Sequence, residues 1–172
     1  PRWLWWSVII VPPVLLALCR SPFMQRKLVY LNAVKPPLFL FPLNTSKEGF
    51  HKSVSITTVD NETLGAWVYN ELYTEEDGKV VLYLHGNGGT RGQWRRYRLY
   101  HVLSKVFEAP VLCFDYRGYG DSTGSPDETG VLIDAIAAWN YAVNDLGASN
   151  VVIWGHSLGT GVSCKLAEVL SS

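Results

Sequence analysis

The segment 151–161, VVIWGHSLGTG, most constrains what this chain can fold into. Its four leading apolar residues predict a buried strand, and the glycine–serine–glycine spacing that follows is typical of a sharp turn into a helix. A serine on such a turn adopts strained backbone angles and needs small neighbours, which Gly155 and Gly159 supply. We therefore expect the Ser157 hydroxyl to lie at the top of a sheet, above a helix N-terminus.

Strand and helix patterns alternate over the rest of the chain from His51 onward. Apolar or β-branched runs predict strands at 54–58, 65–69, 80–84, 111–114 and 151–154. Helical patterns are present at about 93–107, at about 126–146 and from residue 158 onward. Ser125, Pro126 and Glu128 form a start signal for the second helix, with Ser125 as its cap, and Gly147 suits its end. We expect an α/β fold: a mostly parallel sheet flanked by helices.

Composition excludes several classes of protein. The chain is 48% hydrophobic and 17% charged, which excludes a disordered chain. Its 15 basic and 15 acidic residues cancel, which argues against a nucleic-acid partner. Cys19, Cys113 and Cys164 are too scattered for a disulfide framework or a zinc site, so we expect buried thiols, with no metal and no cofactor. The 172 residues suit one domain, and because the first residue is Pro1 we expect a piece of a longer chain.

The first 20 residues differ from the rest of the chain. Residues 3–19 carry no charge, and as a helix of about 25 Å they reach the lower limit for crossing a bilayer. Trp3, Trp5 and Trp6 resemble an interfacial aromatic belt. The alternatives are a signal-peptide core or a buried soluble helix, and Pro12-Pro13 would kink either. We expect three parts: a transmembrane anchor at 1–20, a linker at 21–50 and a partial α/β domain at 51–172.

Two signals disagree about the side of the membrane. Arg20 at the end of the anchor and Arg26 and Lys27 after it favour a cytosolic domain by the positive-inside tendency. Asn44 and Asn61 each begin an N-x-S/T triplet, the glycan acceptor of lumenal loops, and so favour the opposite side. From the residues alone the two signals nearly cancel.

Two glycine-rich turns point to acyl-transfer chemistry. Ser157 is the candidate nucleophile, and the loop 85–90 follows an apolar strand at the same end of the sheet. We expect the N–H groups of Asn87 and Leu158 to form an oxyanion hole, with His85 bracing the loop. His156 lies inside the motif, so we expect it to pack or to form hydrogen bonds rather than to act as the base. The loop lacks the Walker G-K-[ST] ending and dinucleotide-fingerprint spacing, which excludes a phosphate cradle.

Four motifs in order carry a family resemblance. They are HGNGGTRG at 85–92, FDYRGYGDS at 114–122, WGHSLGTG at 154–161 and QRKLVYLNAVKPP at 25–37. The chain resembles membrane-anchored α/β-hydrolase-domain lipases, of the monoacylglycerol and lysophosphatidylserine lipase branch. The resemblance implies a serine hydrolase that cleaves acyl esters of single-chain lipids through an acyl-enzyme. It also implies a single-pass glycoprotein of the endoplasmic reticulum membrane with a lumenal catalytic domain. This agrees with the side of the membrane that Asn44 and Asn61 indicate, and not with the side that the basic residues indicate.

The end of the chain departs from that family. Only 15 residues follow Ser157, whereas the triad of this fold runs from serine to Asp or Glu and then to His. The triad cannot be completed here, so we expect this chain as written to be inactive, with Asp115 and Asp121 structural. The alternative is a truncated, non-catalytic membrane protein that binds lipid or a partner through the unpaired edge of its last strand. Thioesterase or peptidase chemistry would use the same serine.

An arginine cluster allows two interpretations. Arg91, Arg95, Arg96 and Arg98 lie together, with no acidic residue between Lys79 and Phe107. One interpretation is an anion site near the mouth of the active site, suited to a phosphate-bearing lysolipid. The other is a solvated helix face.

Overall fold

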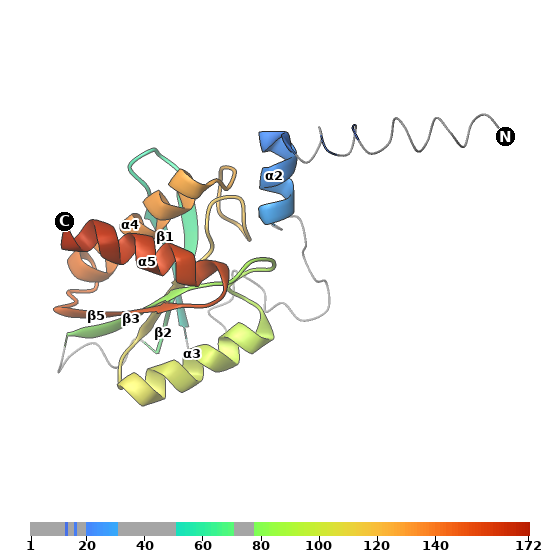
Figure 1. Cartoon of the computed structure of the whole chain (residues 1–172). Coiled ribbons are helices and arrows are strands. Elements are labelled where there is room, and N and C mark those ends of the chain that lie inside the picture. The colour runs from blue at the N-terminus through green and yellow to red at the C-terminus, as the bar shows by residue number, and fades with distance from the viewer. Residues whose placement is uncertain (1–12, 14–15, 17–19, 31–50, 71–77) are drawn as a thin grey trace, which may run out of the picture.

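A computed structural model describes residues 13, 16, 20–30, 51–70 and 78–172 of the chain. Figure 1 shows a central sheet with helices on both faces and a short helix, α2, beside it. In chain order the elements are α2 (Pro22–Val29), β1 (His51–Thr57), β2 (Thr63–Tyr69), β3 (Lys79–Leu84), α3 (Trp94–Phe107), β4 (Val111–Phe114), α4 (Glu128–Asn144), β5 (Asn150–Gly155) and α5 (Leu158–Ser171). All five strands and all three helices that the sequence predicts from residue 51 onward are present.

The sheet is mixed, which corrects the prediction of a mostly parallel one. Its strand order is β1-β2-β4-β3-β5. β3 pairs in parallel with β4 and β5, because helices cross over between them, whereas β1–β2 and β2–β4 are antiparallel. β1 and β2 form a hairpin whose turn contains Asn61 in the left-handed region, and this hairpin adds its second strand to β4 in the opposite direction. Among the described strands, β5 lies at one edge.

Two layers of apolar side chains hold the helices to the sheet. Successive residues of β3 point to opposite faces, so Val81 and Tyr83 pack toward α3, whereas Leu82 and Leu84 pack toward α4 and α5. This alternation explains why β3 reads as a continuous apolar run. The helices in Figure 1 lie accordingly, with α3 on one face and α4 and α5 on the other.

The start of α4 corrects a predicted cap. The cap is Asp127 and not Ser125: Asp127 has extended backbone angles, and its Oδ1 accepts from the backbone N of Gly130 at 2.7 Å. A carboxylate there also suits the positive end of the helix dipole. Pro126 precedes the cap, and Gly147 lies beyond the helix end with a φ of 67°.

The first 50 residues are described only in part. Most of the predicted anchor at 1–20 lies outside the described residues, and so does Asn44. Among the described residues, no helix has the length and apolar character to cross a membrane. The predicted linker contains α2, which begins with Pro22 at its first turn and ends with Arg26 and Lys27 in its last, both favourable positions. The division into three parts stays a prediction.

Candidate active site

Ser157 lies on the sharp turn that its motif predicts. With His156 it connects the last residue of β5 to the first residue of α5, its φ and ψ are 53° and −114°, and it is exposed. A positive φ at a residue with a side chain is strained, and such strain persists only where the surroundings impose it. The hydroxyl is therefore presented to solvent at the N-terminus of α5.

The two glycines of the motif are required by close packing. A Cβ at Gly159 would lie 2.0 Å from the backbone oxygen of Leu84, at the end of β3. A Cβ at Gly155 would lie 2.3 Å from Ser163 Oγ and 2.5 Å from the oxygen of Gly159. The backbone of the turn thus rests on the end of β3 with no room for a side chain, as the motif predicts.

The loop after β3 touches the serine turn. A Cβ at Gly86 would lie 3.1 Å from Ser157 Cβ and 2.7 Å from His156 Nδ1, so the backbone of Gly86 passes directly beside the serine. Leu158 is the first residue of α5, and its N–H has no partner within the helix. The structure therefore brings together the two segments that carry the predicted donors, the N–H groups of Asn87 and Leu158.

The Asn87 side chain is fixed by three neighbours. Its Oδ1 accepts from the Tyr119 hydroxyl at 2.9 Å and from the backbone N of Gly88 at 2.8 Å. Its Nδ2 donates to the backbone oxygen of Val29, at the end of α2. The helix that follows the apolar N-terminal segment therefore contacts the loop beside the candidate nucleophile, a contact that the sequence did not indicate.

His85 braces the loop, as predicted. It is fully buried, its Nδ1 lies 2.7 Å from the oxygen of Gly86, and its Nε2 lies 3.4 Å from the backbone N of Tyr116. Burial and the Arg96 guanidinium lower the pKa of His85 well below its ordinary value, so the ring is neutral. A neutral ring that donates from Nδ1 and accepts at Nε2 satisfies both contacts.

The arginine cluster divides into two kinds, of which only the exposed one matches a predicted interpretation, the solvated helix face. Arg95 and Arg98 are exposed, and Arg98 lies over the Trp94 ring, as on a solvated helix face. Arg91 and Arg96 are buried. Arg96 donates to three backbone oxygens of the loop after β3, which is neither of the predicted roles.

Arg91 joins two carboxylates. It donates from Nη1 to Asp115 and to Asp121, each at 2.6 Å, and from Nη2 to Asp121 at 2.9 Å. Burial raises the pKa of Asp115 to about 6 although Arg91 opposes the shift. Burial also acts to raise the pKa of Asp121, but the Arg91 guanidinium holds it below its ordinary value. Both aspartates therefore hold the loops around the site, as the sequence predicts.

No described residue completes a catalytic triad. Among the residues that the structure describes, no histidine forms a hydrogen bond with the Ser157 hydroxyl. His156 is exposed beside Gly86, and His101 contacts the Tyr69 hydroxyl at 3.1 Å.

Among the residues that the structure describes, no group of His, Cys, Asp and Glu is arranged to hold a metal ion. Of the two described cysteines, Cys113 is buried as expected, but Cys164 is exposed because it lies on the outer side of α5.

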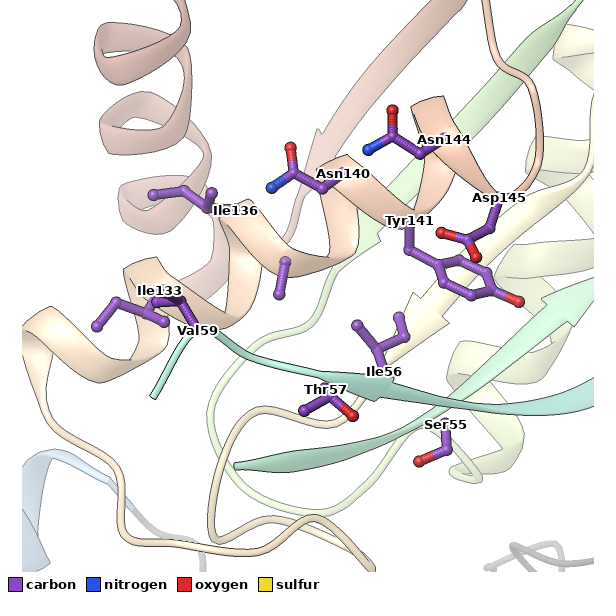
Figure 2. A pocket seen from close by; sticks show the side chains of 11 residues that line it. Ser55, Ile56, Thr57, Val59, Ile133, Ile136, Asn140, Tyr141, Asn144 and Asp145 are labelled. Carbon is purple, nitrogen blue, oxygen red and sulfur yellow. The ribbon is translucent and has the colours of Figure 1, made fainter. Parts of the chain in front are cut away.

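Two cavities differ in their relation to the serine. Figure 2 shows one of about 330 Å³ between β1 and α4, lined by Ile56, Ile136 and Tyr141 among others, which shares no residue with the serine turn or the loop after β3. The other, of about 510 Å³, begins at Leu158 and runs between α4 and α5 to Tyr30. Its lining includes the apolar side chains Val131, Leu132 and Val162 and the polar ones Glu128, Thr129 and Lys165.

Comparison with curated proteins finds relatives over nearly the whole chain. Lysophosphatidylserine lipase ABHD12 of Gallus gallus is 39% identical over 95% of this chain and 47% of its own length. The protein of the same name from Xenopus tropicalis is 38% identical over 95% of this chain and 46% of its length. The chain thus spans about half the length of the curated relatives it matches.

Solved structures share the fold. An α/β hydrolase from Vibrio vulnificus matches with a TM-score of 0.62 and 30% identity, covering 74% of this chain and 42% of its own. An esterase, Pf2001, from Pyrococcus furiosus matches with a TM-score of 0.60 and 26% identity, covering 77% of this chain and 51% of its own. The family profile of the α/β hydrolase fold matches residues 79–172, which is more than half of the chain. With the strained serine turn between β5 and α5, this match shows that the chain belongs to the α/β-hydrolase family.

Proposed function

We propose that this chain carries the nucleophile and the oxyanion hole of a serine hydrolase that cleaves acyl esters of single-chain lipids. The observation that carries the proposal is the Ser157 turn, with an exposed hydroxyl, a φ of 53° and the backbone of Gly86 beside it. A strained, solvent-facing serine next to a glycine-rich loop is the arrangement that this chemistry needs.

The reaction follows from the placement of these groups. Ser157 Oγ attacks the ester carbonyl carbon while its proton passes to a general base, and the carbonyl π electrons move onto oxygen. The N–H groups of Asn87 and Leu158 donate to that oxyanion. Its collapse expels the alcohol, which takes up the proton and leaves an acyl-enzyme that water cleaves by the same steps. None of the described histidines forms a hydrogen bond with the Ser157 hydroxyl, so the proposal assigns the general base to none of them.

Three observations support a lipid substrate of the monoacylglycerol or lysophosphatidylserine type. Relatives 37–39% identical are named lysophosphatidylserine lipases. The cavity that begins at Leu158 has a predominantly apolar lining and a volume within the roughly 300–1,000 Å³ range of ligand sites, which suits one acyl chain. The apolar segment 3–19, acting as an anchor, would hold the site at a membrane where such lipids are concentrated.

Labelling with a fluorophosphonate tests the nucleophile. In the product of the complete reading frame we expect the probe to label the wild type and Ser171→Ala, and to leave Ser157→Ala unlabelled, because only Ser157 lies on the strained turn. Ser171 is a matched control because it is an exposed serine at the other end of the same helix. Competition by monoacylglycerol, lysophosphatidylserine and a peptide ester ranks the substrates. Equal labelling of all three proteins would refute the nucleophile, whereas an unlabelled wild type would favour the non-catalytic alternative.

We also propose that the domain is lumenal, in the endoplasmic reticulum, with glycans on Asn44 and Asn61. Asn61 is exposed in the turn between β1 and β2, and Thr63 of its acceptor triplet is exposed as well. In mammalian cells we expect endoglycosidase H to shift the wild type and an Asn144→Gln control on a gel, and not the Asn44→Gln, Asn61→Gln pair. Asn144 is an exposed asparagine outside any acceptor triplet. An unshifted wild type would instead favour the cytosolic orientation that Arg20, Arg26 and Lys27 indicate.

A further inference from the structure

Arg96 is a buried cation that serves one short loop. Its side chain comes from the first turn of α3, and the residue is 7% exposed. Nη1 donates to the backbone oxygen of Thr90, and Nη2 donates to those of Gly86 and Gly88, all at 2.7 Å. Among the described residues it forms no ion pair, in contrast to Arg91 and Arg117. Its charge is therefore not cancelled by a carboxylate in direct contact.

Peptide geometry relates this cation to the candidate oxyanion donor. In a planar trans peptide the C=O and N–H bonds point in opposite directions, and no described peptide bond is cis. The oxygen of Gly86 and the N–H of Asn87 belong to one such peptide. Because Arg96 binds that oxygen, the N–H of Asn87 points away from Arg96. The guanidinium therefore fixes the direction in which this donor faces.

The same peptide is also polarised. The oxygen of Gly86 has two donors at 2.7 Å, Arg96 Nη2 and His85 Nδ1. Donors at the oxygen of an amide increase the positive character of its N–H, and the effect is largest for a charged donor in a buried setting. Ser157 Cβ lies 3.1 Å from the position of a Cβ on Gly86, so the peptide adjoins the place where negative charge would develop.

We propose that Arg96 is a positioning residue of the oxyanion hole, which orients and polarises the Gly86–Asn87 peptide so that its N–H stabilises the oxyanion formed at Ser157. The inference rests on the proposed hydrolase function and adds an electrostatic role for a residue that touches neither substrate nor nucleophile. Arginine is suited to the role because its planar fork reaches three carbonyls at once, whereas a lysine ammonium acts as a point charge. The cation is fixed before the reaction begins, so its field requires no reorganisation when charge develops.

Kinetics of three variants in the product of the complete reading frame test the role. For Arg96→Met we expect kcat to fall about 100-fold with KM changed less than about threefold, because the lost stabilisation belongs to the transition state. Arg96→Lys should retain an intermediate kcat. Arg98→Met is the matched control, since Arg98 is an exposed arginine on the same helix, and its kcat should stay within about twofold. Affinity for a trifluoromethyl ketone, which forms a tetrahedral oxyanion with the serine, should fall in parallel with kcat/KM.

A spectroscopic readout on this chain separates polarisation from mere loop packing and needs no turnover. In ¹⁵N NMR spectra, a weaker donor contact at the Gly86 oxygen should shift the Asn87 amide upfield in Arg96→Lys, with no such shift in Arg98→Met. Should Arg96→Met fail to fold, the lysine variant alone decides. An unchanged Asn87 resonance, or a kcat in Arg96→Lys equal to that of the wild type, would overturn the inference. Fluorophosphonate labelling of wild-type Ser157 reports on the hydrolase function independently, so the two failures are distinguishable.

Discussion

Replacing Arg91 with methionine is expected to lower the free energy of unfolding by about 3–5 kcal/mol, the cost of removing one partner of a buried ion pair. Arg91 and Asp115 are almost wholly buried, at 2% and 0% exposure. Asp115 receives both the side-chain Nη1 and the backbone N of Arg91, each at 2.6 Å. The methionine variant keeps the backbone contact and the volume but leaves the carboxylate without its cation.

The loss should depend on pH in a defined direction. With Arg91 in place, burial raises the pKa of Asp115 in the folded protein to about 6. Arg91 opposes this shift, so its replacement by methionine should raise the pKa of Asp115 above 6. A carboxyl whose folded pKa exceeds its unfolded value, about 3.9, favours folding when protonated and loses that stability as the pH rises. Below pH 6 the Asp115 carboxyl is protonated in both folded proteins, so the difference between them is smallest there and grows above pH 6.

Urea unfolding followed by circular dichroism at pH 5 and pH 8 measures this difference. The double variant Arg91→Met, Asp115→Asn should recover at least half of the loss at pH 8, because it removes the uncompensated charge together with its partner. Arg95→Met, an exposed arginine nearby in sequence, should change stability by less than about 0.5 kcal/mol. A loss that is equal at both pH values and is not recovered by the asparagine would show that Arg91 acts by packing alone.

The serine turn was predictable because its requirements are local. Gly155, Ser157 and Gly159 lie within five residues, and each is needed by the backbone of the same turn. Continuous apolar runs likewise identify β3 and β4, since burial on two faces leaves such a pattern, whereas the half-exposed β1 was identified by its β-branched residues. The direction of the strands was harder to predict from the sequence. The hairpin of β1 and β2 is local, but the antiparallel pairing of β2 with β4 joins residues more than 40 positions apart.

The arginine roles could not be predicted from the charge pattern. Arg95 and Arg96 are adjacent in sequence, yet one is exposed and the other buried, because successive helix positions differ by about 100° in direction. Arg91 binds Asp115 and Asp121 across 24 and 30 residues, distances over which the sequence holds no pairing signal. A run of arginines without acidic residues predicts a solvent-exposed segment. Here, however, Arg96 is buried and donates to backbone carbonyls, and Arg91 is buried and binds carboxylates remote in sequence.

The remaining large effect concerns two glycines of α5 that differ only in what surrounds them. Gly159→Ala is expected to lower the free energy of unfolding by about 3 kcal/mol or more, at the upper end of the cost of overpacking. Its Cβ would lie 2.0 Å from the oxygen and 2.6 Å from the carbon of Leu84, and 2.9 Å from the oxygen of His85. All three atoms are backbone, so no side chain can rotate away, and either β3 or the Ser157 turn must move.

Gly161→Ala is the matched control and should have the opposite sign. A Cβ at Gly161 would meet nothing within 4 Å, and the residue lies inside α5, where alanine is about 1 kcal/mol more favourable than glycine. Urea unfolding of both variants gives the two free energies, and fluorophosphonate labelling of Ser157 shows whether the turn keeps its geometry. Because Gly159 touches β3 directly, its alanine variant should lose labelling even where it remains folded, whereas Gly161→Ala should keep it. A neutral Gly159→Ala with full labelling would mean that the turn does not rest on β3 as the structure shows.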